Sequence, residues 1–227
     1  MNLVSRTLAK RERRARREAE LGARQRALPG KRYGVILADP PWRFEPYSRI
    51  TGMDRAADNH YPTSPLEEIK ALDVASITAR DCVLFLWATV PMLPQALDVM
   101  AAWGFTYKSS FAWAKDKIGT GYWARNTHEP LLIGTRGSVP APAPGTQAAS
   151  LIEAPVGRHS EKPAIFYEII EGYFPTLPKI ELHARGVVAR PGWDVWGLEA
   201  PIDGLRTIIS SLPATQDGKL AIGRSCG

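Results

Sequence analysis

Four consecutive residues, Asp39-Pro40-Pro41-Trp42, have side chains and backbone groups suited to binding an amine. Two successive prolines remove two backbone N–H donors and stiffen the turn, so we expect its carbonyl oxygens to face outward as acceptors. An exocyclic amine can then donate to the Asp39 carboxylate and to the Pro40 carbonyl, while Trp42 stacks on the face of a purine. This arrangement points the lone pair of the amine nitrogen at an electrophile. The structural alternative is a strand-end turn with a buried tryptophan.

Short apolar runs place this turn at the end of a strand. Residues 33–38 are almost wholly apolar, as is typical of a parallel strand that is covered on both faces, and residues 82–88 form a second such run. In open α/β sheets, ligands bind beyond the carboxyl ends of the strands. Because Asp39 directly follows the first run, the turn occupies the position where such a sheet binds its ligand.

The rest of the chain alternates between helical and extended patterns. We predict three helices: one begins at Ser64-Pro65, the second runs from Pro94 to Trp103, and the third from Glu161 to Gly172. We predict further strands from Phe105 to Trp113, from Pro130 to Gly134 and from Pro178 to Ala184. Residues 137–157 are rich in Pro, Ala, Gly and Ser, which predicts a mobile loop. The alternation predicts an α/β fold: a mostly parallel open sheet with helices on both faces.

Composition narrows the class of protein. A chain of 227 residues suits one globular domain with a small appendage. We find neither an apolar run of the roughly 18 residues that a membrane span needs nor the apolar core of a signal peptide. The two cysteines, Cys82 and Cys226, are too few for a disulfide framework. We therefore expect a cytoplasmic protein.

The basic charge is concentrated at the N-terminus. Residues 1–32 carry eleven Lys/Arg and three Asp/Glu, a net +8, which leaves −2 for the remainder of the chain, whose total is +6. The pattern predicts a basic helical arm, with two interpretations: a solvated helix, or a polybasic element that binds nucleic acid. Residues from 200 onward are weakly patterned and predict a peripheral tail.

Several motifs occur together in a fixed order, and their combination resembles one family. They are Asp39-Pro-Pro-Trp42, Asn59-His-Tyr-Pro-Thr63, Gly157-Arg-His-Ser-Glu-Lys-Pro163, Ile180-Glu-Leu-His-Ala-Arg185, Gly192-Trp193 and Trp196-Gly197. The combination is similar to the MT-A seventy (MT-A70) family of S-adenosylmethionine-dependent adenine-N6 methyltransferases, in its compact bacterial and phage form. The resemblance implies a Rossmann-like methyltransferase fold in permuted order, with the catalytic motif ahead of the cofactor motif. It covers residues 31–199 and leaves the arm, 1–30, and the tail, 200–227, outside.

The resemblance also implies roles for residues near the acceptor base. Asp39, Pro40, Pro41 and Trp42 are expected to hold the adenine amine next to the methyl donor. Tyr61 is expected to form a gate beside the cofactor and the target base. Trp123, Arg125 and His128 are expected near the target nucleotide, where aromatic and guanidinium groups suit stacking and phosphate contact. For His128 and its neighbour Glu129, a hydrogen-bonded corner with no role in binding is the alternative.

On the cofactor side, the resemblance implies a second set of residues. Lys162 is expected at the junction of cofactor and target, and Glu181 and Arg185 beside the cofactor, with Arg185 reaching the ribose hydroxyls. Relatives often have Asn and Gln where this chain has Leu198 and Glu199. Glu199 can still accept from ribose hydroxyls, whereas the side chain of Leu198 cannot form a hydrogen bond. His183 stands inside a predicted strand, where we assign it no role.

Three functions remain open at this point. The first is an adenine-N6 methyltransferase that acts on DNA, the second is the same reaction on RNA, and the third is a noncatalytic scaffold that binds nucleic acid. The intact Asp39-Pro-Pro-Trp42 motif favours activity, and methyl transfer from a sulfonium needs no metal site. The sequence leaves open whether the protein acts alone, as a homodimer or with a partner subunit.

Overall fold

In the computed structural model, the structure describes residues 31–42, 64–119, 121, 123–142, 145–157, 161–184 and 190–197. The strands are β1 (Tyr33–Ala38), β2 (Thr78–Trp87), β3 (Thr106–Lys115), β4 (His128–Arg136), β5 (Leu151–Ala154), β6 (Lys179–Leu182) and β7 (Trp193–Trp196). The helices are α2 (Leu66–Lys70), α3 (Val74–Ile77), the 3₁₀ turn η3 (Val90–Met92), α4 (Leu93–Ala102) and α5 (Ala164–Tyr173). The predicted basic arm and C-terminal tail lie outside this part of the chain.

The strands form one seven-stranded sheet in the order β5-β3-β4-β2-β1-β6-β7. β1 pairs in parallel with β2 and β6, β6 with β7, and β3 with β5, whereas β4 is antiparallel to both β2 and β3. Among the described strands, β4 therefore runs opposite to the other six. The predicted fold class, a mostly parallel open α/β sheet, is confirmed.

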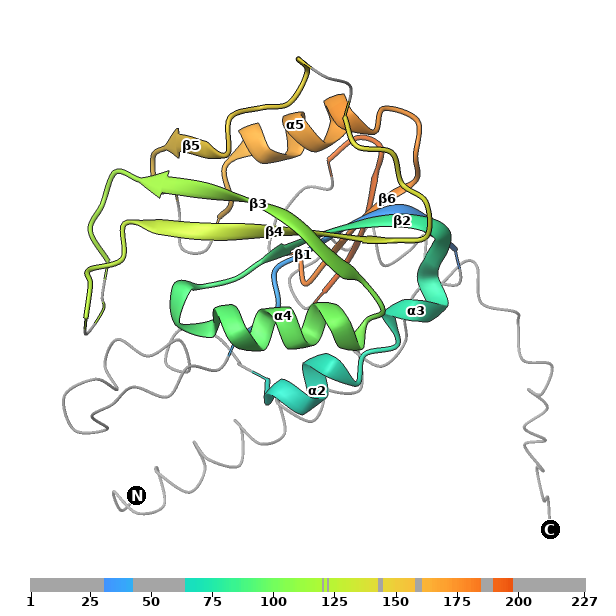
Figure 1. The fold of residues 1–227 in the computed structure, drawn as a ribbon, viewed down its shortest axis with the longest axis horizontal. Coiled ribbons are helices and arrows are strands. Elements are labelled where there is room, and N and C mark those ends of the chain that lie inside the picture. Colours follow the sequence, from blue (N-terminus) through green and yellow to red (C-terminus); the bar gives the residue numbers. More distant parts are fainter. Residues whose placement is uncertain are drawn as a thin grey trace, which may run out of the picture.

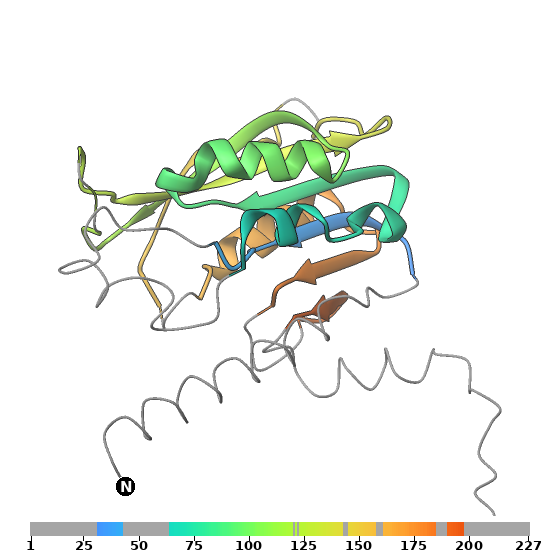
Figure 2. The same ribbon diagram turned by 90° about the horizontal axis from the view of Figure 1, so that it is seen from below.

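Helices cover both faces of the sheet. Figure 1 shows α2, α3 and α4 on one side and α5 on the other, and Figure 2 shows the same layers from below. Alternate residues of β1 point to opposite faces of the sheet. Ile36 packs in the core between the sheet and α4, and Val35 and Leu37 pack in the core between the sheet and α5. All six residues of β1 are buried, as its apolar sequence predicts. No helix in the described part of the chain is long and apolar enough to cross a membrane.

Two predicted helices differ from the observed ones at prolines and at a capping aspartate. The helix expected from Glu161 begins at Ala164, because the residue before a proline is disfavoured in the α conformation and Pro163 itself has an extended ψ of 137°. The helix predicted to begin at Ser64-Pro65 begins at Leu66 and ends at Lys70. A second helix, α3, begins after Asp73, whose side chain accepts the Ser76 N–H. Lys162 therefore lies in an extended segment before α5.

The sequence prediction missed both edge strands. Residues 151–154, within the segment predicted to be a mobile loop, pair with β3 as β5, and residues 193–196 pair with β6 as β7. Each strand is four residues long, and β5 alternates between exposed and half-buried residues. Such a short run has little periodicity of its own, so its extended form depends on the neighbouring strand.

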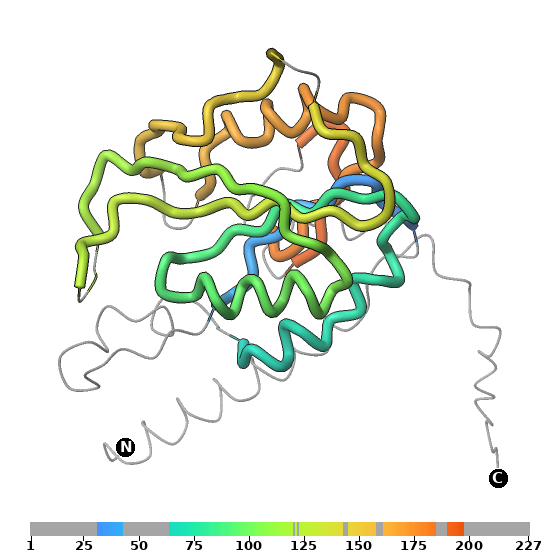
Figure 3. Tube along the Cα trace, in the orientation of Figure 1, coloured from blue at the N-terminus to red at the C-terminus, as the bar shows by residue number. Residues whose placement is uncertain are grey.

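The strand directions bring distant parts of the chain to one edge of the sheet. The carboxyl ends of β1, β2, β3 and β6 meet there, and the amino end of the antiparallel β4 joins them. Beyond this edge, β3 and β4 continue into a hairpin, which Figure 3 traces as the green segment projecting from the body. Asp39, directly after β1, lies at this edge.

Candidate active site

Asp39 is held at the mouth of the sheet by backbone and side-chain contacts. Its N–H donates to the Leu182 carbonyl at the end of β6, at 3.2 Å, so the turn continues the β1–β6 pairing by one residue. Its side chain is 13% exposed and forms an ion pair with Lys162 across 3.2 Å. The carboxylate is therefore fixed in a mostly buried site that retains access to solvent.

The two prolines shape the turn after Asp39. The Trp42 N–H donates to the Pro40 carbonyl at 2.8 Å, the bond pattern of a γ-turn around Pro41. The inverse γ-turn needs a φ close to the value that a proline ring fixes, which explains Pro41 at its centre. The Pro41 carbonyl accepts the Ser64 N–H at 3.0 Å. Both carbonyls thus accept backbone N–H groups, and the Pro40 oxygen keeps a second lone pair.

Trp42 anchors this turn. Its indole N–H donates to the Trp87 carbonyl at the end of β2, at 3.0 Å. The side chain is buried, at 6% exposure, in the cluster between the sheet and α4. In this position the ring connects the end of β1 to the end of β2. Its stacking on adenine stays a prediction.

Lys162 links the turn after β1 to β4. Its ammonium contacts Asp39 at 3.2 Å and Glu129 at 2.8 Å, with the lysine side chain 8% exposed. The ammonium also lies 5.2 Å from the centroid of the Trp87 ring, within range of a cation–π contact. Burial works to lower the pKa of Lys162, but the two carboxylates raise it above the ordinary value. Lys162 therefore stays charged.

Glu129 and Lys115 complete the cluster, and neither was assigned a site role from the sequence. Glu129 is buried at 7% exposure, and Lys115 at the end of β3 contacts its second oxygen at 2.6 Å. In an extended strand Glu129 shares a face with Leu131, which is fully buried, and this spacing was the signal available from the sequence. Burial acts to raise the pKa of Glu129, but the ammonium groups of Lys162 and Lys115 hold it below the ordinary value. These contacts make Glu129 part of the charged cluster, and a role of His128 and Glu129 near the target nucleotide stays a prediction.

Glu181 lies on β6 opposite Leu37 of β1, on the face covered by α5. The Tyr167 hydroxyl donates to its carboxylate at 2.9 Å. Burial, with a contribution from the nearby Asp39 charge, raises the pKa of Glu181 to about 7, although Tyr167 and Lys162 act in the opposite direction. Glu181 therefore changes charge near neutral pH.

The strand that carries Glu181 is fixed to β7 and α5. Glu171 of α5 accepts from the Arg190 guanidinium and from the Trp193 indole N–H, the latter at 2.8 Å. At the other end of β7, a Cβ on Gly197 would lie 2.7 Å from the Ala184 nitrogen, so a side chain does not fit there. These contacts give the Gly192-Trp193 and Trp196-Gly197 motifs a structural basis.

The sequence predicted that His183 lies inside a strand, but β6 ends at Leu182 and His183 follows it. Its φ of 61° is the left-handed conformation that ends the strand, and its ring contacts Trp196 edge-on at 5.4 Å.

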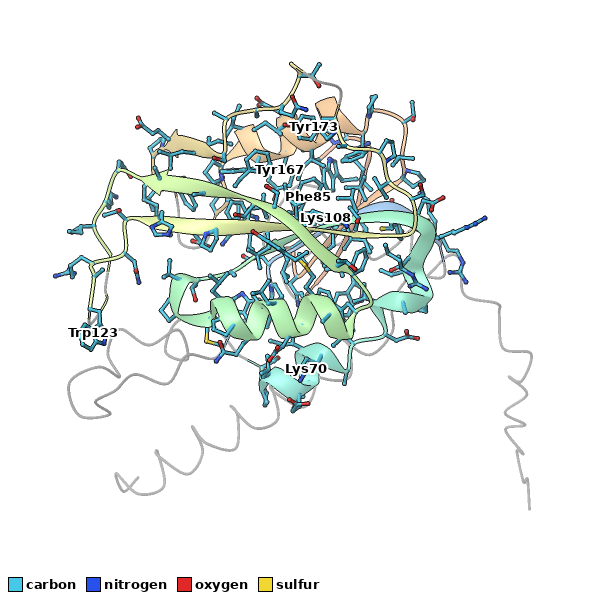
Figure 4. All side chains as sticks on the ribbon, in the orientation of Figure 1. Lys70, Phe85, Lys108, Trp123, Tyr167 and Tyr173 are labelled. Carbon is cyan, nitrogen blue, oxygen red and sulfur yellow. The ribbon has the colours of Figure 1, made fainter. Side chains whose placement is uncertain are left out.

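The three residues expected near the target nucleotide lie on and around the β3–β4 hairpin. Trp123 is fully exposed, and Figure 4 shows it projecting away from the core residues Phe85 and Tyr167. Arg125 is exposed and its Nε donates to the Gly119 carbonyl at 2.7 Å, which closes the hairpin. His128 is exposed at the start of β4. The structure brings together Asp39, Lys162 and Glu181, and it places Trp123 and Arg125 outside this cluster.

Three predicted site residues, Tyr61, Arg185 and Glu199, lie outside the described residues. Within the described ranges, no group of three His, Cys, Asp or Glu side chains could hold a metal ion.

The residues at this edge offer hydrogen-bond donors and acceptors that suit the functional groups of S-adenosylmethionine. Glu181 offers a carboxylate of the kind that accepts from ribose hydroxyls at the ends of sheet strands. Lys162 uses two of its three N–H donors on the described carboxylates, which leaves one for the carboxylate of an amino acid group. The Asp39 carboxylate, which can accept a hydrogen bond from an amine, contacts the same Lys162 ammonium. The arrangement can therefore orient an amine against a bound methyl donor.

The seven-stranded, mostly parallel open sheet, with helices on both faces, is a Rossmann-like methyltransferase fold. Comparison with known proteins agrees. The family model MT-A70 matches residues 33–199, so the chain belongs to the MT-A70 family, whose members are methyltransferases.

Individual relatives fall into two groups. The chain is 39% identical to the "Type II methyltransferase M.MunI" of Mycoplasma sp., over 77% of this chain and 80% of that protein. It is 29% identical to the "N(6)-adenosine-methyltransferase MT-A70-like protein" of Drosophila melanogaster, over 78% of this chain, and 29% identical to the "N(6)-adenosine-methyltransferase MT-A70-like" of Arabidopsis thaliana, over 80%. It spans only 28% and 25% of the length of those two proteins.

Proposed function

We propose that the protein transfers the methyl group of S-adenosylmethionine to the N6 amine of adenine in DNA. The observation that carries the proposal is the Asp39 carboxylate, held at the carboxyl end of β1 on the buried Lys162 ammonium. The adenosine-N6 specificity in the names of the MT-A70 relatives supports the acceptor atom. The Mycoplasma relative, which is more similar and matches over most of its own length, favours DNA over RNA.

The chain's own residues provide alignment. Asp39 accepts one hydrogen of the amine, and the second lone pair of the Pro40 carbonyl accepts the other, so the nitrogen lone pair is left to attack. Trp42 fixes the turn from below through the Trp87 carbonyl. The bound cofactor supplies an activated methyl group, and in-line positioning of donor and acceptor provides most of the rate enhancement.

The remaining site residues are assigned by the same proposal. Lys162, Glu181, Arg185 and Glu199 bind the cofactor; Tyr61, Trp123, Arg125 and His128 contact the target. The exposed Trp123 at the hairpin suits stacking on a base. The N-terminal arm, residues 1–30, carries nine Lys/Arg and three Asp/Glu, a net +6, and is proposed to contact phosphates. We also propose a cytoplasmic location.

RNA is the second candidate acceptor, because the Drosophila and Arabidopsis relatives are named for adenosine. The test offers both acceptors in parallel. Purified protein is incubated with radiolabelled S-adenosylmethionine and either adenine-unmethylated genomic DNA or total RNA, and the nucleosides are separated after digestion. We expect label in N6-methyl-2′-deoxyadenosine. Label in N6-methyladenosine alone would move the proposal to RNA, and nucleic-acid binding without label in either would favour the scaffold.

A matched variant separates the proposed site from contaminating activity. Asp39→Ala should lose the label, whereas Asp98→Asn, on the exposed face of α4, should keep it. Equal labelling by the Asp39 variant would exclude the turn as the site of transfer.

A further inference from the structure

A chain of four alternating charges crosses the site. It runs from Asp39 to Lys162 at 3.2 Å, from Lys162 to Glu129 at 2.8 Å, and from Glu129 to Lys115 at 2.6 Å. The members come from four separate elements: the turn after β1, the segment before α5, β4 and β3. With two carboxylates and two ammonium groups, the chain is neutral.

The two inner members depend on both of their neighbours. The side chains of Lys162 and Glu129 are 8% and 9% exposed, so water compensates neither charge. Burial of an ion costs free energy unless opposite charges and hydrogen bonds replace the lost solvent. Lys162 therefore needs Glu129 as well as Asp39, and Glu129 needs Lys115 as well as Lys162.

Strand register fixes Lys115 on Glu129. Trp113 pairs with Glu129 across β3 and β4, so Lys115, two residues further along β3, is the diagonal neighbour on the same face. Its ammonium also lies 4.6 Å from the centroid of the Trp113 ring, a second contact that holds it in place. At 26% exposure, the Lys115 side chain closes the chain toward solvent.

We propose that Lys115 is a positioning residue for methyl transfer: through Glu129 it holds the Lys162 ammonium on the Asp39 carboxylate. Lys115 contacts Glu129, and Glu129 contacts Lys162, so Lys115 acts on Lys162 and Asp39 through the shared carboxylate. This inference rests on the proposed function, because its main readout is the transfer reaction.

The sign of the effect follows from the charge count. Among the described residues, the groups that face the chain are its four members and, from β6 and α5, Glu181 and Tyr167. Replacing Lys115 with methionine leaves Asp39, Lys162 and Glu129 with a net charge of −1 beside Glu181. Lys115 is one of the two cations that lower the pKa of Glu129. Its removal raises that pKa, so Glu129 takes up a proton at higher pH and no longer holds Lys162 as a charged partner.

The first experiment measures single-turnover methyl transfer against pH for the full chain. For Lys115→Met we expect the acidic limb of the profile to move up by about 1 unit, which at pH values on that limb is roughly a tenfold loss of rate. Lys115→Arg should restore the wild-type limb, because it returns the cation. Lys117→Met is the matched control: it removes one positive charge from an exposed position two residues away and should leave the limb unchanged.

A second measurement does not need activity. In ¹⁵N-lysine spectra of the protein with S-adenosylmethionine, the Nζ signal of Lys162, identified by its loss in Lys162→Arg, should shift in Lys115→Met and stay in place in Lys117→Met. An unchanged pH limb together with an unchanged Lys162 signal in folded Lys115→Met would overturn the inference. A wild-type protein that methylates no nucleic acid would overturn the proposed function instead, and the Lys162 signal would still decide whether Lys115 acts on it.

Discussion

Replacing Asp39 with asparagine tests the acceptor site with the least change in shape. The side chain keeps an oxygen acceptor but loses its charge, so the ion pair with Lys162 at 3.2 Å becomes a hydrogen bond from the ammonium to a neutral amide oxygen. A bond to a charged group contributes about 1.5–3 kcal/mol, and one between neutral groups about 0.5–1.5 kcal/mol. The difference at the amine is therefore about 1–2 kcal/mol, or roughly a 5–30-fold loss of single-turnover rate.

The fold should survive this change. Lys162 keeps Glu129 at 2.8 Å as a charged partner, so its ammonium is not left uncompensated. We expect the free energy of unfolding to fall by about 1–3 kcal/mol, below the cost of leaving a buried charge alone. Binding of S-adenosylmethionine should stay within a few-fold of wild type, because Asp39 is assigned to the amine.

The assay is quenched-flow transfer of labelled methyl groups to DNA, with calorimetry for cofactor affinity and Asp98→Asn as the exposed control. A transfer rate for Asp39→Asn equal to wild type would refute the assignment of Asp39 to the acceptor amine. A large loss of cofactor affinity with an unchanged rate at saturation would move Asp39 to the cofactor side.

Four further predictions address the rest of the molecule. Because burial raises the pKa of Glu181 to about 7, its ionisation lowers the free energy of unfolding as pH rises from about 4.5 to 7. Glu181→Gln should remove about 3 kcal/mol of this pH-dependent decrease. Urea unfolding of both proteins at pH 5 and 8 measures the difference. Trp42→Ala should lower the free energy of unfolding by about 3–5 kcal/mol, and a loss under 1 kcal/mol would show that the indole is not the anchor described. Gly197→Ala should cost about 1–3 kcal/mol, since its Cβ would meet the Ala184 nitrogen at 2.7 Å, and an unchanged melting temperature would contradict this close approach. Deletion of residues 1–29 should flatten the slope of log affinity for DNA against log salt by about 4–5 units if four to six of its basic residues engage phosphates, with cofactor affinity unchanged; an equal slope would place the nucleic-acid path on the remainder of the chain.

The turn after β1 could be found from the sequence because its signals are local. An apolar run of six residues specifies a buried strand, and Asp39 is the first polar residue after it. The fold class followed from the alternation of such runs with helical patterns. The family motifs added Lys162 and Glu181, which the structure places within the same cluster as Asp39.

Other features required the sheet to be assembled. The edge strands β5 and β7 are too short to show a period, and they are extended because β3 and β6 offer paired backbone groups. The burial of Trp42 depends on a hydrogen bond to Trp87, which is remote in the chain. Sequence reasoning gave Trp42 a stacking role, with a buried tryptophan at a strand end as the alternative, but the sequence could not show which group its indole N–H contacts.

The charge chain shows most clearly which features the sequence determines and which depend on the tertiary structure. The sequence alone determined that a carboxylate follows a buried strand, because the hydrophobic pattern of six neighbouring residues is enough to place it. Only the tertiary structure decided that Lys162, Glu129 and Lys115 surround that carboxylate, because these contacts depend on the register of β3 against β4 and on the order of strands in the sheet. The raised pKa of Glu181 has the same origin, since burial by α5 and proximity to Asp39 exist only after distant segments have packed together.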